Sequence, residues 1–242
     1  YPYDEPGGNG WKVVNDLIAF AKLVRVANPK VMIYVNGGGD VPMFEALAPY
    51  TDIWCPGIYQ LAEKSPLMDI VRGSGKMLWS YNCAYAYARP VGPNIKNINI
   101  IADFRTAALF ALRHNASGIG FWSYNIGDDP WTRVAMEYVL VYPGRDKPIT
   151  SRRWEAVREG IEDYRIIAAL RQQAEKADAD TQAKLNDLLE VSLPGFIDQS
   201  CNEMLQGASR SVIDATNSEA AMAALRAETM ECVKAMSTGA AS

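Results

Sequence analysis

The sequence predicts an α/β protein that forms part of a (β/α)8 TIM barrel, about strands four to eight, followed by a helical C-terminal extension. Three observations predict this fold class. Strand-like and helix-like segments alternate over the first ~140 residues, which is the order of parallel βα units. Each expected strand ends at Gly, Asn or Pro, and polar and aromatic residues collect at these ends. From residue 150 onward the apolar pattern is helical.

The barrel part is expected over residues 1–150. Short apolar or aromatic runs predict strands at 1–6, 30–39, 51–57, 75–83 and 117–125. Apolar residues at helical spacing predict helices over 11–26, 43–47, 66–72 and 99–115. A doubly wound sheet has the same alternation, but no strand here is followed by the G-x-G-x-x-G signature of dinucleotide binding. A full barrel has eight strands. We therefore expect the earlier strands to lie in a missing N-terminal part of the same protein, upstream or as a separate chain.

Residues 151–242 are expected to form a helical extension packed on the barrel. Its long first helix begins at a Thr150 or Ser151 cap. Further helices are expected near 179–191 and 217–236, with a break at Leu193-Pro194-Gly195. The Ala/Ser tail is expected to fray from about residue 237.

Composition excludes several classes of function. The chain has 242 residues with 24 Lys+Arg and 28 Asp+Glu, a net charge of −4 and no basic cluster, which argues against a nucleic-acid partner. No apolar run approaches the ~18 residues of a membrane span. The single histidine, His114, argues against a Ser-His-Asp triad or a multi-histidine metal site. The four cysteines lack metal-ligand spacing. The predicted function implies no metal and no organic cofactor.

The adjacent carboxylates Asp4 and Glu5 are the strongest candidates for catalysis. They are followed by Pro6 at the carboxyl end of the first expected strand, beside Tyr3. In a (β/α)8 barrel that end of each strand faces the active site. A surface turn is the alternative reading, because Asp-Glu pairs are common.

Aromatic and amide side chains form the second candidate group. Trp79 and Tyr81 share one face of their expected strand by alternation, and so do Trp122 and Tyr124, whereas Trp54 lies on a third strand. Barrel cores prefer Val, Ile and Leu, and buried Trp and Tyr need hydrogen-bond partners. An aromatic wall with amide groups suits a sugar ring, and a packed core is the alternative. The expected substrate-binding residues are Tyr3, Asn36, Tyr59, Trp79, Tyr81, Asn82, Trp122 and Tyr124.

The later strand ends carry no second carboxylate. A usual retaining glycosidase needs two carboxylates ~5 Å apart, but Asp40, Glu63, Asp128 and Asp129 fall in expected loops. If no nucleophile lies outside this chain, the pattern fits substrate-assisted hydrolysis, in which the 2-acetamido oxygen of the sugar attacks the anomeric carbon. Glu5 would be the general acid/base. Asp4 would orient the acetamido N–H and stabilise the intermediate.

Three strings resemble glycoside hydrolase family 123 and its relatives. They are YPYDEP at 1–6, GFWSYN at 120–125 followed by Pro130-Trp131, and the segment at 142–170. The last is similar to a recurrent pattern, S-x-R-x-E-x-x-R-x-G-x-E-D-Y, matched here by Ser151, Arg153, Glu155, Arg158, Gly160, Glu162, Asp163 and Tyr164. The resemblance covers roughly residues 1–175.

This resemblance implies a retaining, substrate-assisted β-N-acetylgalactosaminidase with a (β/α)8 barrel and a glycan substrate. It implies that Asp4 polarises the acetamido group and Glu5 is the acid/base, and it favours a secreted or periplasmic location. The family's N-terminal β-sandwich and first barrel strands have no counterpart in this sequence. Two alternatives remain open. One is a glycosidase for a sugar without an acetamido group, and the other is a non-catalytic glycan-binding barrel.

Overall fold

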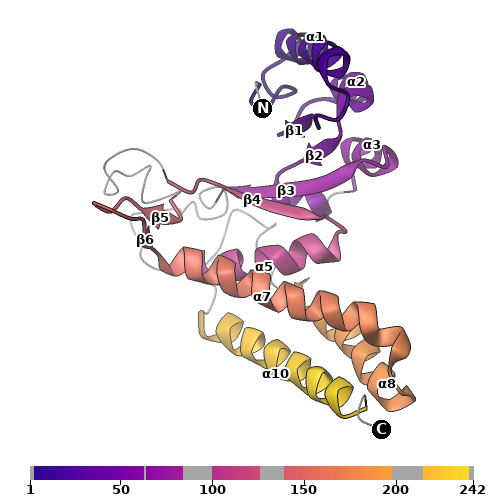
Figure 1. The fold of residues 1–242 in the computed structure, drawn as a ribbon, viewed down its shortest axis with the longest axis vertical. Coiled ribbons are helices and arrows are strands. Elements are labelled where there is room, and N and C mark those ends of the chain that lie inside the picture. The colour runs from indigo at the N-terminus through magenta and orange to yellow at the C-terminus, as the bar shows by residue number, and fades with distance from the viewer. Residues whose placement is uncertain (1–2, 63, 84–99, 126–138, 198–214, 240–242) are drawn as a thin grey trace. The chain divides into compact units, whose positions relative to one another are not determined.

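The computed structural model describes residues 3–62, 64–83, 100–125, 139–197 and 215–239 (Figure 1). The chain divides into two compact units. The first unit comprises residues 1–83 and 114–122, and the second comprises residues 84–113 and 123–242. Each unit is described by itself below.

The first unit is built on a four-stranded parallel sheet in the order β1-β2-β3-β4 (Figure 1). The strands are β1 (Tyr34–Asn36), β2 (Ile53–Cys55), β3 (Met77–Cys83) and β4 (Gly118–Trp122). The register pairs Val35 with Trp54, Trp54 with Leu78, and Trp79 with Gly118. The order of the four strands in the sheet therefore equals their order along the chain. Successive parallel βα units predict this order for four of the expected strands. The sheet is open in the described residues, and no closed barrel is seen there.

Short helices alternate with these strands. They are α1 (Trp11–Ala27), α2 (Val41–Leu47), the 3-10 turns η1 (Ala48–Tyr50) and η2 (Ile58–Ala62), and α3 (Pro66–Gly73). Asp40 and Ser65 cap α2 and α3, because their side chains accept the N–H of Met43 and of Met68. Each cap satisfies a backbone N–H at the start of its helix that has no partner within the helix.

The core of the first unit is formed by buried apolar side chains of α1, α2, η2, α3 and the strands. Trp54, which is 1% exposed, stacks its indole on Phe44 with ring centroids 5.1 Å apart. Its indole N–H donates to Ser74 Oγ at 3.2 Å. Trp54 therefore follows the packed-core alternative and does not line a sugar site.

Among the described residues of the second unit, the regular elements are helices and one small antiparallel pair of strands. Its elements are α5 (Ile100–Arg113), β5 (Val141–Tyr142), β6 (Ile149–Thr150), α7 (Arg152–Gln173), η4 (Ala174–Lys176), α8 (Ala179–Asp187), η5 (Leu188–Ser192) and α10 (Ala215–Gly239). The antiparallel pair β5–β6 was not expected from the sequence, because each strand has only two residues and shows no alternation. Ser151 caps α7 as predicted by accepting the Trp154 N–H at 3.2 Å.

The predicted break at Leu193-Pro194-Gly195 is wrong. Residues 193–197 are helical and follow the π-turn η5 directly. A π-turn changes the hydrogen-bond spacing from i−4 to i−5. Pro194 directly follows this change of spacing, and the helix continues through it although Pro194 has no N–H to donate.

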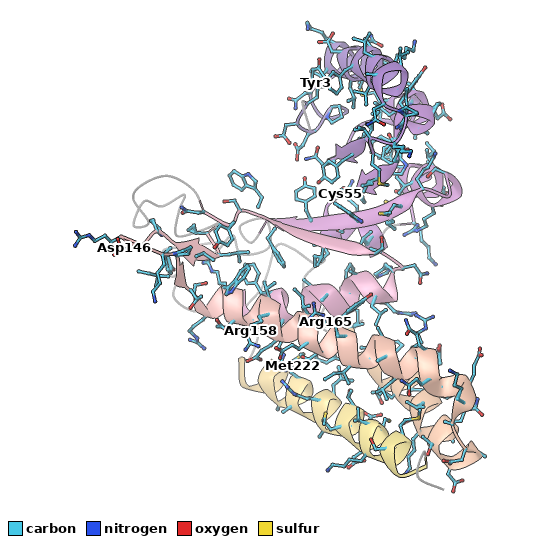
Figure 2. The ribbon with its side chains drawn as sticks, in the orientation of Figure 1. Tyr3, Cys55, Asp146, Arg158, Arg165 and Met222 are labelled. Carbon is cyan, nitrogen blue, oxygen red and sulfur yellow. The ribbon has the colours of Figure 1, made fainter. Side chains whose placement is uncertain are left out.

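Helices α5 and α7 pack closely because Gly160 of α7 has no side chain. A Cβ at Gly160 would lie 2.1 Å from the backbone oxygen of Arg105 in α5. Asp163, one turn further along α7, accepts Arg105 Nε and Nη2 at 2.9 Å each. Arg158 lies on α7 between Glu155 and Glu162 and is half-exposed (Figure 2). The recurrent string on α7 therefore has a helix-packing role in this unit.

Within the described ranges, no helix combines the length and apolar character needed to cross a membrane. In the same residues, no group of three or more His, Cys, Asp and Glu side chains is arranged to hold a metal ion.

Candidate active site

The segment that carries Asp4 and Glu5 is a turn, which corrects the predicted strand at 1–6. Residues 3–5 are bends and residues 6–9 form a turn, while residues 1–2 lie outside the described part. The Asn9 N–H donates to the Glu5 carbonyl at 3.0 Å. Asn9 Nδ2 also donates to the carbonyls of Asp4 and Glu5, at 2.8 and 3.2 Å. These local bonds replace the ladder that a strand would need.

The turn is attached to the carboxyl end of β1 through Asn36. The Glu5 N–H donates to Asn36 Oδ1 at 3.1 Å, and Asn36 Nδ2 donates to Asp4 Oδ1 at 3.1 Å. Asn36 is the last residue of β1. The structure therefore places the carboxylate pair at the carboxyl end of β1, whereas the sequence analysis placed it at the end of a strand over residues 1–6.

Glu5 has a backbone conformation that is rare for a residue with a side chain. Its φ is 41°, in the left-handed region. A non-glycine residue held there costs on the order of 1–3 kcal/mol, and such residues cluster at functional sites. The neighbouring Gly37 also has a positive φ of 79°. A Cβ on Gly37 would lie 2.7 Å from Glu5 Cγ, so only glycine leaves room for the Glu5 side chain.

A second glycine contact brings the turn close to the loop after β1. A Cβ on Gly7 would lie 2.3 Å from the Gly38 carbonyl oxygen. Sequence reasoning identified the glycine run 37–39 as the end of a strand and missed this supporting role. Asn9 was missed as well, because a lone Asn before a helix carries no distinctive signal.

The Glu5 carboxylate reaches across the sheet to β3. Tyr81 donates its hydroxyl to Glu5 Oε1 at 2.7 Å. The backbone of Tyr81 is held in turn by a parallel bridge to Gly57 after β2. Asp4, Glu5, Asn36 and Tyr81 therefore form one connected cluster at the carboxyl edge of the sheet.

Trp79 lies two residues before Tyr81 and shares its strand face, as alternation predicted. A Cβ on Gly118 would lie 2.6 Å from the indole of Trp79, so this glycine leaves room for the ring against β4. The Tyr34 ring lies 6.0 Å away at 57°. The Tyr34 hydroxyl is hydrogen-bonded to the Cys55 thiol, and burial raises the pKa of that thiol to about 11. Cys55 is therefore a protonated core residue at neutral pH.

The first unit holds four other predicted binding residues, Tyr3, Tyr59, Asn82 and Trp122. Trp122 ends β4 at the same edge of the sheet and is 49% exposed. The Tyr3 ring packs edge-on against Phe20 of α1, with centroids 6.3 Å apart. Figure 2 shows Tyr3 on the turn that precedes α1. Tyr59 lies in η2 and Asn82 lies on β3 opposite Phe121.

Tyr124 belongs to the second unit. It is 50% exposed and meets Trp154 of α7 edge-on, with centroids 5.7 Å apart. Among the predicted site residues whose side chains the structure describes, hydrogen bonds join Asp4, Glu5, Asn36 and Tyr81 to one another.

Comparison with protein families matches more than half of the chain to one family. A family model described as "Glycoside hydrolase 123, catalytic domain" matches residues 39–170, a range that contains Tyr81 and begins after Asn36. A solved structure from a study of glycolipid glycan hydrolysis by a family 123 glycoside hydrolase from Clostridium perfringens aligns with a TM-score of 0.49 and 14% identity. The alignment covers 92% of this chain and 47% of that one, so the chain spans about half the length of the solved protein. A search of the curated proteins found no match.

Proposed function

This chain belongs to glycoside hydrolase family 123, and we propose that it carries the catalytic pair of a retaining, substrate-assisted glycosidase. The proposed substrate is a glycan with a β-linked N-acetylhexosamine, with N-acetylgalactosamine favoured. The observation that carries the proposal is the cluster in which Asn36 binds Asp4 and Glu5 while Tyr81 binds the Glu5 carboxylate. It gives the two neighbouring carboxyl groups separate partners and therefore separate roles.

In the first proposed step, Asp4 accepts the N–H of the 2-acetamido group and orients its carbonyl oxygen toward the anomeric carbon. That oxygen forms a bond to the anomeric carbon as the glycosidic bond breaks. Glu5 donates its proton to the departing glycosidic oxygen, so the aglycone leaves as a neutral alcohol. The products of this step are an oxazolinium-like intermediate, stabilised by ionised Asp4, and an ionised Glu5.

In the second step, the Glu5 carboxylate takes a proton from a water molecule that attacks the anomeric carbon. The bond to the acetamido oxygen breaks and the acetamido group is restored. Two displacements at the same carbon retain its configuration. Because the sugar supplies the nucleophile, one acid/base residue and one orienting carboxylate are enough.

We also propose that β1–β4 form part of the wall of a (β/α)8 barrel, with residues 1–150 belonging to the barrel and 151–242 to a helical extension. Consecutive order with all-parallel pairing supports this proposal, because barrel strands follow one another around the wall. A doubly wound sheet reverses its order at a switch point. Such a barrel places the carboxyl edge of the sheet, and with it the cluster, at the mouth.

Inhibition by a thiazoline analogue tests substrate assistance. We expect N-acetylgalactosamine-thiazoline to inhibit the protein competitively, and we expect turnover of aryl N-acetyl-β-galactosaminide but not of the matching aryl β-galactoside, because only the former supplies the nucleophile. Rates and inhibition constants measured on both substrates check this. Hydrolysis of the galactoside without thiazoline inhibition would support an enzyme for sugars without an acetamido group. Glycan binding without any turnover would support the alternative of a non-catalytic glycan-binding barrel.

The Gly37→Ala variant tests the placement of Glu5. The added Cβ would lie 2.7 Å from Glu5 Cγ, so Glu5 must move. A displacement of about 1 Å lowers kcat on the order of 10²-fold. The matched control is Gly75→Ala, because Gly75 has a similar φ of 64° and no atom lies within 4 Å of the position that an added Cβ would take. Both variants bear the same kind of backbone strain, so equal kcat values for the two would contradict the role of Gly37.

A further inference from the structure

We propose that Asn36 is a positioning residue that holds Asp4 and Glu5 in a fixed arrangement through the two ends of its carboxamide. The sequence suggested Asn36 as a substrate-binding residue. The contacts show its oxygen on the Glu5 N–H and its nitrogen on the Asp4 carboxylate, both at 3.1 Å. The inference rests on the proposed function, because it assigns Asn36 to the orientation of that catalytic pair.

The chemistry of the partners determines the orientation of the amide. A backbone N–H can only donate and an ionised carboxylate can only accept. Only one flip of Asn36 therefore satisfies both bonds. An ionised aspartate can only accept, and leucine can neither accept nor donate, so neither of these side chains of similar shape replaces both bonds of the amide. The site selects asparagine by its hydrogen-bonding pattern.

The contact also fixes an otherwise unfavourable backbone. Glu5 has a φ of 41°, and its N–H would point into a turn without a ladder partner. Asn36 supplies the acceptor for that N–H, and Asn9 supplies donors for the carbonyls of Asp4 and Glu5. Of these two asparagines, Asn36 also reaches a catalytic side chain, at Asp4 Oδ1. Its loss should therefore affect the step that Asp4 serves more than it affects folding.

The Asn36→Asp variant separates the two bonds. The new side chain still accepts the Glu5 N–H, but in its ionised form it no longer donates to Asp4. Whether the two carboxylates repel each other or share one proton, Asp4 loses its fixed ionised form. The matched control is Asn28→Asp. Asn28 Oδ1 accepts the Lys30 N–H at 3.0 Å in an exposed turn, so this control keeps the same kind of bond away from the cluster.

The test measures kcat/KM for aryl N-acetyl-β-galactosaminide, the inhibition constant of the thiazoline, the affinity for N-acetylgalactosamine, and the midpoint of thermal unfolding. Relative to Asn28→Asp, we expect Asn36→Asp to lower kcat/KM and thiazoline affinity about 100-fold. Affinity for the product should change much less, because the charge that Asp4 stabilises is present in the intermediate and absent from the product. If Asn36→Asp does not fold, Asn36→Ser, which is too short to reach both partners, is expected to show the same pattern.

Two results would overturn the inference about Asn36 and leave the proposed function intact. In the first, the thiazoline inhibits the wild-type enzyme, but Asn36→Asp has the same kcat/KM and the same thiazoline affinity as Asn28→Asp. In the second, Asn36→Asp lowers thiazoline affinity and product affinity by the same factor and also lowers the midpoint of thermal unfolding. That result would show that the role of Asn36 is purely structural. A wild-type protein that neither hydrolyses the acetamido substrate nor binds the thiazoline overturns the proposed function, and the inference with it.

Discussion

Replacing Glu5 by glutamine is expected to lower kcat by about 10²- to 10⁴-fold on a substrate with a poor leaving group, which is the usual range for loss of a general acid/base. Glutamine keeps an oxygen that can accept the Tyr81 hydroxyl, so the turn at the end of β1 should be retained. The loss in kcat/KM, which reports the first step, should shrink with a dinitrophenyl leaving group, because that group departs without protonation. The loss in kcat should remain, because Glu5 is also the base of the second step. Steady-state rates on both substrates measure the difference.

The control for Glu5→Gln is Glu45→Gln, since Glu45 is exposed on α2 and its replacement removes the same charge. Azide provides a further check on the Glu5 variant. With an activated substrate, azide can attack the intermediate without a general base, so it should restore turnover and yield a β-glycosyl azide. A Glu5→Gln variant with equal losses in kcat/KM on both leaving groups and no azide product would show that Glu5 is not the acid/base.

Replacing Asp163 by alanine is expected to lower the free energy of unfolding by about 3 kcal/mol, the low end of the range for removing one partner of a buried ion pair. Asp163 is 8% exposed and accepts two nitrogens of Arg105, and Arg226 lies 3.8 Å from its other oxygen. Without Asp163, the Arg105 guanidinium keeps Glu159 as a partner but loses its buried one. Urea unfolding followed by circular dichroism measures the change.

The neighbouring residue provides the control for Asp163→Ala. Glu162 pairs with Arg158 on the exposed side of α7. Such surface pairs contribute on the order of 0.5 kcal/mol, so Glu162→Ala should be close to wild type. Equal destabilisation by the two variants would show that burial between α5 and α7 is not what makes Asp163 important.

The strands of the sheet were predictable because each is an apolar run that ends at a residue of distinct type. Asn36 and the glycines after it mark the end of β1, and Asn115 with a φ of 57° marks the end of α5. The turn at residues 3–9 could not be predicted from the sequence, because aromatic residues such as those around Asp4 and Glu5 are also typical of a strand. The positive φ of Glu5 determines that these residues form a turn, and this φ depends on contacts with Asn36 and Gly37.

The roles within the candidate site were less predictable than its location. Strand alternation placed Trp79 and Tyr81 on one face, but it could not show that Tyr81 binds Glu5 while Trp79 lies against Gly118. Trp54 had the same appearance in sequence and is buried against Phe44. Which partner an aromatic ring meets depends on the register between strands, and one chain carries no local signal for it.

The contacts of Glu5 also have a consequence for the kinetics of folding. Its partners on β1 and β3 lie 31 and 76 positions further along the chain. Contacts at such separations form late, because the entropy of closing the intervening loops must be overcome first. Recovery of catalytic competence after dilution from denaturant should therefore lag behind helix formation and coincide with pairing of β1, β2 and β3. The residues that open the described chain are among the last to reach their working geometry.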